Sequence, residues 1–125
     1  MDLMRSKEVV NFFHYDARNL EYEKEHGTPE TRINVQLHIL TDAKEDLPDT
    51  KVQINLSSLI VLNKFVLSSA FSQVTQVIDR QIKNQADLTQ QEMQELASPL
   101  FEILKDLAYE ITEVALDEPG LRLEF

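Results

Sequence analysis

The sequence contains no cysteine, and only two of its 125 residues are glycine. Without a thiol, a disulfide, a thiolate metal site and a cysteine nucleophile are all excluded. The two glycines, Gly27 and Gly120, are far apart, so no glycine-rich loop is present to hold a phosphate group. None of the three histidines, His14, His26 and His38, has a second histidine within four residues, a spacing that disfavours a metal site. We therefore predict that the protein is not an enzyme and has no cofactor and no metal.

Positive charge is also scarce, because 12 Lys and Arg face 22 Asp and Glu and the net charge is −10. An acidic surface repels phosphate backbones, so we predict no nucleic-acid partner. The longest apolar stretch, residues 59–67, is interrupted by Asn63 and Lys64 and is far shorter than the roughly 20 residues of a membrane span. The first residues, MDLMRSKEVV, lack the apolar core of a signal peptide. We expect no membrane insertion and a cytoplasmic location.

Three segments have the composition or the alternation of β-strands. Residues 8–15 are rich in valine and aromatic residues, and residues 31–40 and 51–57 alternate between apolar and polar side chains. We predict strands over about residues 8–16, 31–41 and 50–62. The charged segment 19–30, which ends in Gly-Thr-Pro, is predicted as a loop, and segment 41–50, with its Pro-Asp pair, as a turn.

Residues 64–78, KFVLSSAFSQVTQVI, have two interpretations. Their apolar side chains are spaced by three and four residues, which is typical of a helix. Their content of Val, Ile, Thr and Phe favours a strand instead. We predict a strand, which gives a sheet of four strands, whereas the helical alternative leaves three. As a strand, this segment has apolar side chains on both faces, and each face then needs a cover.

The helical signal is strong after Leu88. Thr89 and Glu92 match a capping box, and apolar residues then recur with a period of 3.6 as far as Ala115. Pro99 lies inside this pattern and removes one backbone hydrogen bond, so a kink or a split into two helices is expected near it. We predict a helical region over about residues 90–116 and an extended tail over 120–125. Together the elements make one α+β domain, residues 1–125, with an antiparallel sheet covered on one face by the helix.

One long helix cannot cover both faces of such a sheet. Apolar side chains from residues 64–78 and from the first strand are then left outside, and an apolar patch of this kind usually meets a partner. A homo-oligomer, as a dimer or tetramer, is the commonest solution, and an open groove for another chain is the alternative. The candidate residues for a polypeptide-binding or oligomer interface are Phe12, Phe65, Phe71 and Val74.

The C-terminal part of the sequence resembles SecB, the bacterial export chaperone. Its helix opens with a proline followed by a leucine and an aromatic residue, and further on come an acidic residue with isoleucine, a proline and an alternating tail. These positions are Pro99, Leu100, Phe101, Glu110, Ile111, Pro119, Leu121 and Leu123. The phrases FHYDAR, GTPET and YEITEVALDEPG are in addition similar to those of a family of short uncharacterised proteins from Gram-positive bacteria that share the SecB fold.

The resemblance implies a SecB-like order of four strands and one helix, assembly into dimers and dimers of dimers, and the holding of unfolded chains without ATP. Our first hypothesis is accordingly a non-enzymatic binding protein for unfolded or extended polypeptides. The second is a structural or regulatory partner of one specific protein, with its apolar faces used in homo-oligomerisation. The third is a small-molecule binder at a subunit interface.

Overall fold

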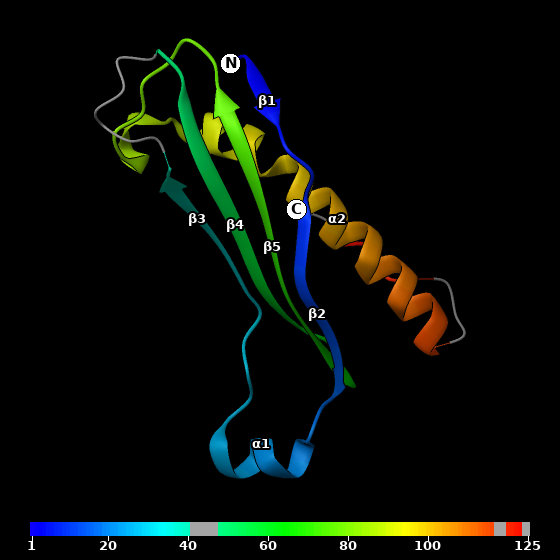
Figure 1. Cartoon of the computed structure of the whole chain (residues 1–125). Helices are drawn as coiled ribbons and strands as arrows, with labels where there is room; N and C mark the ends of the chain where they lie inside the picture. The colour runs from blue at the N-terminus through cyan, green and yellow to red at the C-terminus, as the bar shows by residue number, and fades with distance from the viewer. Residues whose placement is uncertain (41–47, 117–119, 124–125) are drawn as a thin grey trace.

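The computed structural model describes residues 1–40, 48–116 and 120–123, so most of the predicted turn at 41–50 lies outside the described residues. Within these ranges it contains five strands, two α-helices and one short 3₁₀ helix (Figure 1). In chain order these are β1 (Leu3–Arg5), β2 (Val9–Ala17), α1 (Leu20–His26), β3 (Arg32–Ile39), β4 (Thr50–Val61), β5 (Phe65–Val77), the 3₁₀ helix (Gln85–Asp87) and α2 (Gln90–Leu116).

All strand pairs of the sheet are antiparallel, and β5 lies beside three other strands. One edge of β5 pairs with β4, which in turn pairs with β3. Its other edge pairs with both β1, at residues 75–77, and β2, at residues 65–72. Arg5 and Val9 are four residues apart, whereas their partners Thr75 and Ser72 are three apart, so one extra residue separates β1 from β2. The predicted first strand, residues 8–16, corresponds to β2, and β1 is a fifth strand that the sequence analysis did not predict.

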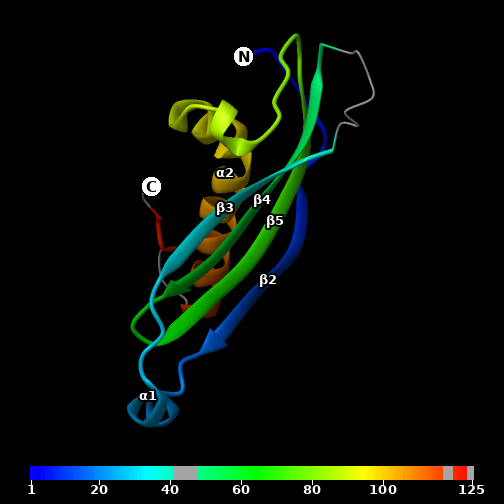
Figure 2. The ribbon, with the colours of Figure 1, turned by 90° about the vertical axis from the view of Figure 1, so that its left-hand side faces the viewer.

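The predicted fold class is confirmed: the protein is α+β, with an antiparallel sheet and one long helix on one face (Figure 2). Residues 65–77 form a strand and not a helix. Every second side chain of β5, starting at Phe65, is buried. Every second side chain of β4, starting at Thr50, is buried in the same way. Because pairing with β4 requires period two, the helical spacing of the apolar residues is overridden.

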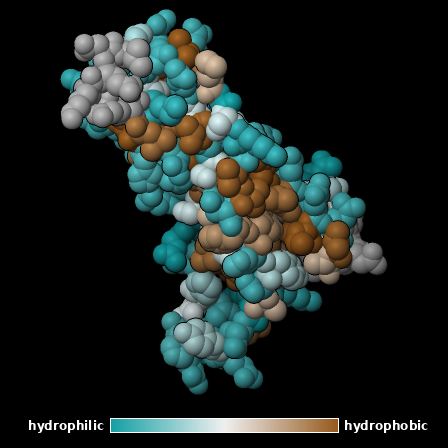
Figure 3. All heavy atoms as spheres, in the orientation of Figure 1, coloured by the Kyte–Doolittle hydropathy of each residue, from teal (hydrophilic) through white to brown (hydrophobic). Residues whose placement is uncertain are grey.

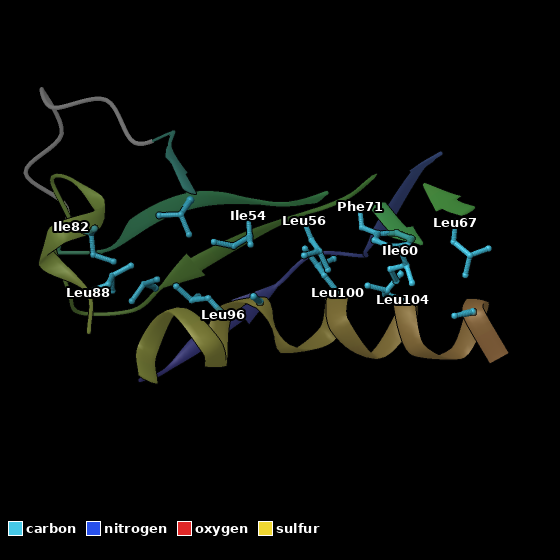
Figure 4. Close-up of a cluster of buried hydrophobic side chains, with 14 of the residues drawn as sticks. Ile54, Leu56, Ile60, Leu67, Phe71, Ile82, Leu88, Leu96, Leu100 and Leu104 are labelled. Carbon is cyan, nitrogen blue, oxygen red and sulfur yellow. The ribbon is translucent and has the colours of Figure 1, made fainter. Parts of the chain in front are cut away.

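The core lies between α2 and the two central strands. Figure 4 shows Ile54, Leu56 and Phe71 pointing from the sheet toward Leu100 and Leu104 on the helix. These five side chains are all at most 1% exposed. Helix α2 thus covers a single face of β4 and β5, as its apolar stripe predicts.

Helix α2 begins with a capping box and continues through Pro99. Glu92 N donates to Thr89 Oγ1 over 3.1 Å, and Thr89 N donates to Glu92 Oε1 over 3.0 Å, so the predicted capping box is formed. Pro99 lies inside one uninterrupted helix of 27 residues, so the alternative of two separate helices is not what forms. No helix of the described residues is long and apolar enough to cross a membrane.

The prediction of a loop at residues 19–30 is wrong over half of its length, because α1 forms there. Asn19 Oδ1 accepts a hydrogen bond from Tyr22 N over 3.0 Å and caps the first turn. Glu21 and Glu23 lie in the first turn and Lys24 in the last, which matches the helix dipole. The high charge of this segment is compatible with a loop, but the order of its charges, acidic first and basic last, favours a short helix.

The described part of the C-terminal tail, residues 120–123, returns to α2. Leu121 N donates to Thr112 Oγ1 over 2.7 Å, and Leu123 packs against the core. A Cβ at Gly120 would lie 2.3 Å from the carbonyl oxygen of Tyr109, so glycine is required for this close approach. Residues 124–125 of the predicted extended tail lie outside the described residues.

Candidate binding surface

The face of the sheet opposite α2, here called the outer face, is the first part of the candidate surface. Among the described residues, α2 is the helix that packs on the sheet, and it lies on the other face (Figure 2). The outer side chains of β5 are half-buried, and no helix of the described residues lies above them. They are Val66, Ser68, Ala70, Ser72, Val74 and Gln76.

Small side chains make a hollow in the outer face. The strand register places Phe12, Ala70, Ser57 and Asn34 in one row across four strands. Directly opposed residues point to the same face, so two small side chains lie between an aromatic ring and an amide. The hollow has a volume of about 330 Å³, and its lining includes Phe12, Arg32, Asn34, Ser57 and Leu59.

The exposed edge of β2 is the second part of the candidate surface. Four of its apolar side chains are between 37% and 49% exposed: Val9, Val10, Phe12 and Tyr15. Val9 and Phe12 lie opposite outer-face residues of β5, whereas Val10 and Tyr15 lie opposite buried ones. Apolar surface therefore flanks both sides of an edge whose outward backbone groups have no partner strand among the described residues.

Apolar surface continues from this edge onto the helix. Figure 3 shows apolar side chains gathered over β2 and over the C-terminal half of α2. Val114 is 80% exposed, and Ile103 and Leu107 are only partly buried. Patches of this kind mark interaction surfaces in soluble proteins.

The structure separates the four predicted interface residues. Phe12 is 42% exposed and borders the hollow, and Val74 lies half-buried on the outer face. Phe65 and Phe71 are only 6% and 1% exposed, because both point into the core beneath α2. Sequence reasoning therefore placed two core residues in the candidate surface. It also missed Val9 and Val10.

A second hollow of about 380 Å³ lies between α1 and the start of β5. Its lining includes Arg18, Tyr22, His26 and Pro29. The Arg18 guanidinium is paired with the Glu23 carboxylate over 2.9 Å and donates to the carbonyl of Leu62, so its charge is already satisfied.

No group of three or more His, Cys, Asp or Glu side chains in the described part of the chain is placed to hold a metal ion.

The chain superposes on the Mycobacterium tuberculosis Rv1957 SecB-like chaperone, solved in complex with a ChAD peptide from the Rv1956 HigA1 antitoxin, with a TM-score of 0.53. The two share 12% identity over 98% of this chain and 90% of that one, so the likeness shows the fold.

At the level of the family, a model described as "Protein of unknown function (DUF1149)" matches residues 1–125, and the chain belongs to this family. A crystal structure of a protein of unknown function from Streptococcus agalactiae is similar over 100% of this chain and 98% of that one. Its TM-score is 0.94 and its sequence is 42% identical. No curated protein sequence matches the chain. The predicted relation to a SecB-like family of uncharacterised proteins is confirmed.

Proposed function

We propose that this protein binds unfolded or extended segments of other polypeptides and holds them without a nucleotide. The observation that carries the proposal is the outer face, which no described helix covers and which contains a hollow of about 330 Å³ beside Phe12. The apolar edge of β2 borders the same hollow. Cytoplasmic action is part of the proposal, and the absence of cysteine is compatible with a reducing compartment.

Binding of this kind needs little sequence choice. An extended chain along the β2 edge gains backbone hydrogen bonds, while every second side chain rests on the apolar surface beside it. The net charge of −10 favours segments that carry lysine or arginine and keeps a loaded complex soluble. The SecB-like chaperone with the same fold was solved with a peptide, which supports the proposal by analogy of fold.

Within the proposed surface we assign contact roles to Phe12 and Val74, joined by Val9. Phe12 has the largest exposed ring on the outer face and stands at the rim of the hollow. Aromatic anchors of this kind contribute strongly to binding because they bury a large apolar area. Phe65 and Phe71 have no contact role in the proposal, since α2 already covers them.

Self-association through the same edge is the second candidate. A nine-residue edge strand with apolar residues on both faces is suited to pair with a second copy about a two-fold axis. A dimer or tetramer built in this way would bury Val9, Val10 and Phe12. The apolar edge would then be used within the oligomer. The surface that remains exposed would bind one specific protein, for which this protein acts as a structural or regulatory partner.

Aggregation suppression tests the first candidate directly. An unfolded client is diluted into buffer without nucleotide, and light scattering is followed with and without the protein. We expect suppression near one protein per client, and we expect Phe12→Ser to weaken it. Leu20→Ser is the matched control, because Leu20 is 55% exposed on α1, away from the outer face. If Phe12→Ser and Leu20→Ser suppress scattering equally well, the assigned surface is wrong.

Light scattering on a gel-filtration column separates the two candidates. A stable dimer or tetramer of the unmodified protein that becomes a monomer with Phe12→Ser, together with no suppression for any of several clients, would favour self-association.

A further inference from the structure

Pro99 leaves one carbonyl group of α2 without its helical partner. In an α-helix the carbonyl of residue 95 accepts from the backbone N–H of residue 99, and proline has none. The Glu95 carbonyl is nevertheless hydrogen-bonded. The Arg5 guanidinium donates to it over 2.8 Å, and Ser98 Oγ donates to it over 3.2 Å. The proline thus creates the acceptor to which a side chain of β1 is bound.

The remaining attachments of β1 are its three-residue pairing with β5 and the hydrogen bonds of the residues beside it. Next to the strand, Ser6 N and Ser6 Oγ donate to the Val74 carbonyl over 2.9 and 2.8 Å, and Val74 N donates to Ser6 Oγ over 3.2 Å. Arg5 also donates to the Leu96 carbonyl over 3.2 Å, and the Gln73 side chain donates to the Ser6 carbonyl over 2.8 Å. The strand is three residues long and is separated from β2 by the interruption described above. Leu3 packs against the core, whereas Met4 points outward and is 64% exposed.

The buried face of β5 includes two polar side chains near β1. Gln73 and Thr75 are 2% and 0% exposed and point toward α2. Gln73 Oε1 and Thr75 Oγ1 have no hydrogen-bond partner within the described residues. Buried polar atoms without partners weaken a packed region, so the part of β5 beside β1 is packed less favourably than the part beside β2, which includes Phe65, Leu67 and Phe71.

We propose that the edge of β5 at residues 74–78 is a strand-acceptor site that β1 occupies in the free protein. An extended segment of a partner polypeptide takes this place when β1 leaves. The incoming segment gains the backbone hydrogen bonds that β1 now makes, such as those of Asp2 and Ser6 with Ile78 and Val74. This inference rests on the proposed function and adds to the outer face and the β2 edge a second place of binding, with a particular mode.

The chemistry of the site defines the segment that it takes. At the position of Leu3, opposite Val77, the site accepts an aliphatic side chain that packs on the core. At the position of Arg5, opposite Thr75, it offers two carbonyls to a guanidinium: that of Glu95, which lacks the helical N–H of residue 99, and that of Leu96. The residue between them points to solvent. The preferred ligand is therefore an extended segment with an aliphatic residue, any residue and an arginine, and the negative net charge favours such a segment further.

A disulfide lock tests whether β1 must leave. The hydrogen bond from Ile78 N to Asp2 O makes the next pair, Leu3 and Val77, one without backbone hydrogen bonds, whose Cα atoms are about 4.5 Å apart in a regular ladder. That separation suits a disulfide. The variant Leu3→Cys with Val77→Cys has a single cysteine pair, since the sequence has no other cysteine. Its reduced form is the matched control for its oxidised form.

The probe is a fluorescently labelled synthetic peptide with the sequence of residues 1–8, and its binding is followed by anisotropy. We expect the reduced form to bind the peptide at least tenfold more tightly than the oxidised form. We also expect Arg5→Ala to bind it about tenfold more tightly than the unmodified protein, because its own first strand has lost the bonds to α2. Met4→Ala changes the same strand at its exposed position and should leave the affinity unchanged.

Two results would overturn the acceptor site: equal binding by the oxidised and reduced forms, and equal binding by Arg5→Ala and Met4→Ala. A third would overturn the stated occupant. If Arg5→Ala forms dimers that have exchanged their first strands, the site takes a second copy of the chain and not a partner segment.

The same two forms distinguish this inference from the proposed function. If an unfolded client is held equally by the oxidised and reduced forms, the proposed function stands and the acceptor site is wrong. If neither form holds the client but the reduced form binds the peptide, the acceptor site stands and the proposed function is wrong.

Discussion

The two faces of β5 come from one strand of 13 residues, and yet they have different surroundings. All seven side chains on the inner face are buried, whereas the six on the outer face are half-buried. Their chemistry does not explain this difference, because each face mixes apolar residues with serine or glutamine. Phe71 and Gln73 are buried side by side, while Val66 and Val74 are left on the open face. What differs is the layer above, since α2 covers only one of the two faces.

The comparison identifies where interaction surface remains. The inner face stabilises the fold, and its apolar side chains are already in contact with α2. The outer face keeps apolar side chains, such as Val66 and Val74, on which no other described element packs. A substitution on the inner face should therefore act on the free energy of unfolding, and one on the outer face should act on binding.

The largest effect is expected for Phe71→Ala. This side chain is 1% exposed in the centre of the core, and its removal should lower the free energy of unfolding by about 3–5 kcal/mol. Val74→Ala, three residues further along on the outer face, should cost about 1 kcal/mol or less. Urea denaturation followed by circular dichroism measures both values. Similar losses at the two positions would contradict an open outer face and would indicate that a second copy covers it in solution.

A smaller effect is expected for the buried serine pair. Ser58 and Ser69 share a hydrogen bond of 2.6 Å on the inner face. Ser69→Ala leaves the Ser58 hydroxyl buried without this partner and should lower the free energy of unfolding by about 1–3 kcal/mol. The double variant with Ser58→Ala should recover most of that loss, because both polar groups are then absent.

Ser68→Ala is the control for this pair. Ser68 lies next to Ser69 on the outer face, and its substitution should change the unfolding free energy by less than about 0.5 kcal/mol. If the double variant is less stable than Ser69→Ala alone, the hydrogen bond is not what the serines contribute.

The sequence predicted the elements whose pattern is local. The period of 3.6 in α2 and its capping box need only neighbouring residues, and both are present in the structure. Alternation along β4 likewise indicated its buried face, with Val52, Ile54 and Leu56 inward. These signals were sufficient for the fold class because a helix with one apolar stripe and a sheet with one apolar face leave few other arrangements.

Which residues form the candidate surface depends on the pairing register of β5 with β2 and β4, and the sequence alone does not reveal this register. Phe71 points inward because it lies opposite Leu56, and Phe12 points outward because it lies opposite Ala70. A strand that is apolar on both faces gives no internal sign of which face the helix covers. Two interruptions, one at Asn11 within β2 and one between β1 and β2, further change which side chains share a face. Two of four predicted interface residues were therefore placed on the wrong side.

On the outer face the expected effect is on binding. Ser57 is exposed beside the hollow, so Ser57→Glu should place a carboxylate in it and change stability by less than about 0.5 kcal/mol. We expect it to weaken binding of a labelled unfolded client about tenfold, which corresponds to roughly 1.4 kcal/mol. Gln36→Glu adds the same charge on the same face, at an exposed position of β3 away from the hollow. Equal losses for the two variants would mean that net charge, and not the hollow, controls binding.

The smallest expected effect tests the connection between α2 and the edge of the sheet. Arg5→Ala removes a donor from the Glu95 carbonyl that Pro99 leaves free, and it should lower the free energy of unfolding by about 1 kcal/mol. With Pro99→Ala the backbone N–H of residue 99 becomes available to that carbonyl, and Arg5→Ala should then cost about 0.5 kcal/mol less. Urea denaturation of the two single variants and the double variant gives this coupling energy. A coupling of zero would show that other contacts hold Arg5, and that Pro99 has no part in attaching β1 to α2.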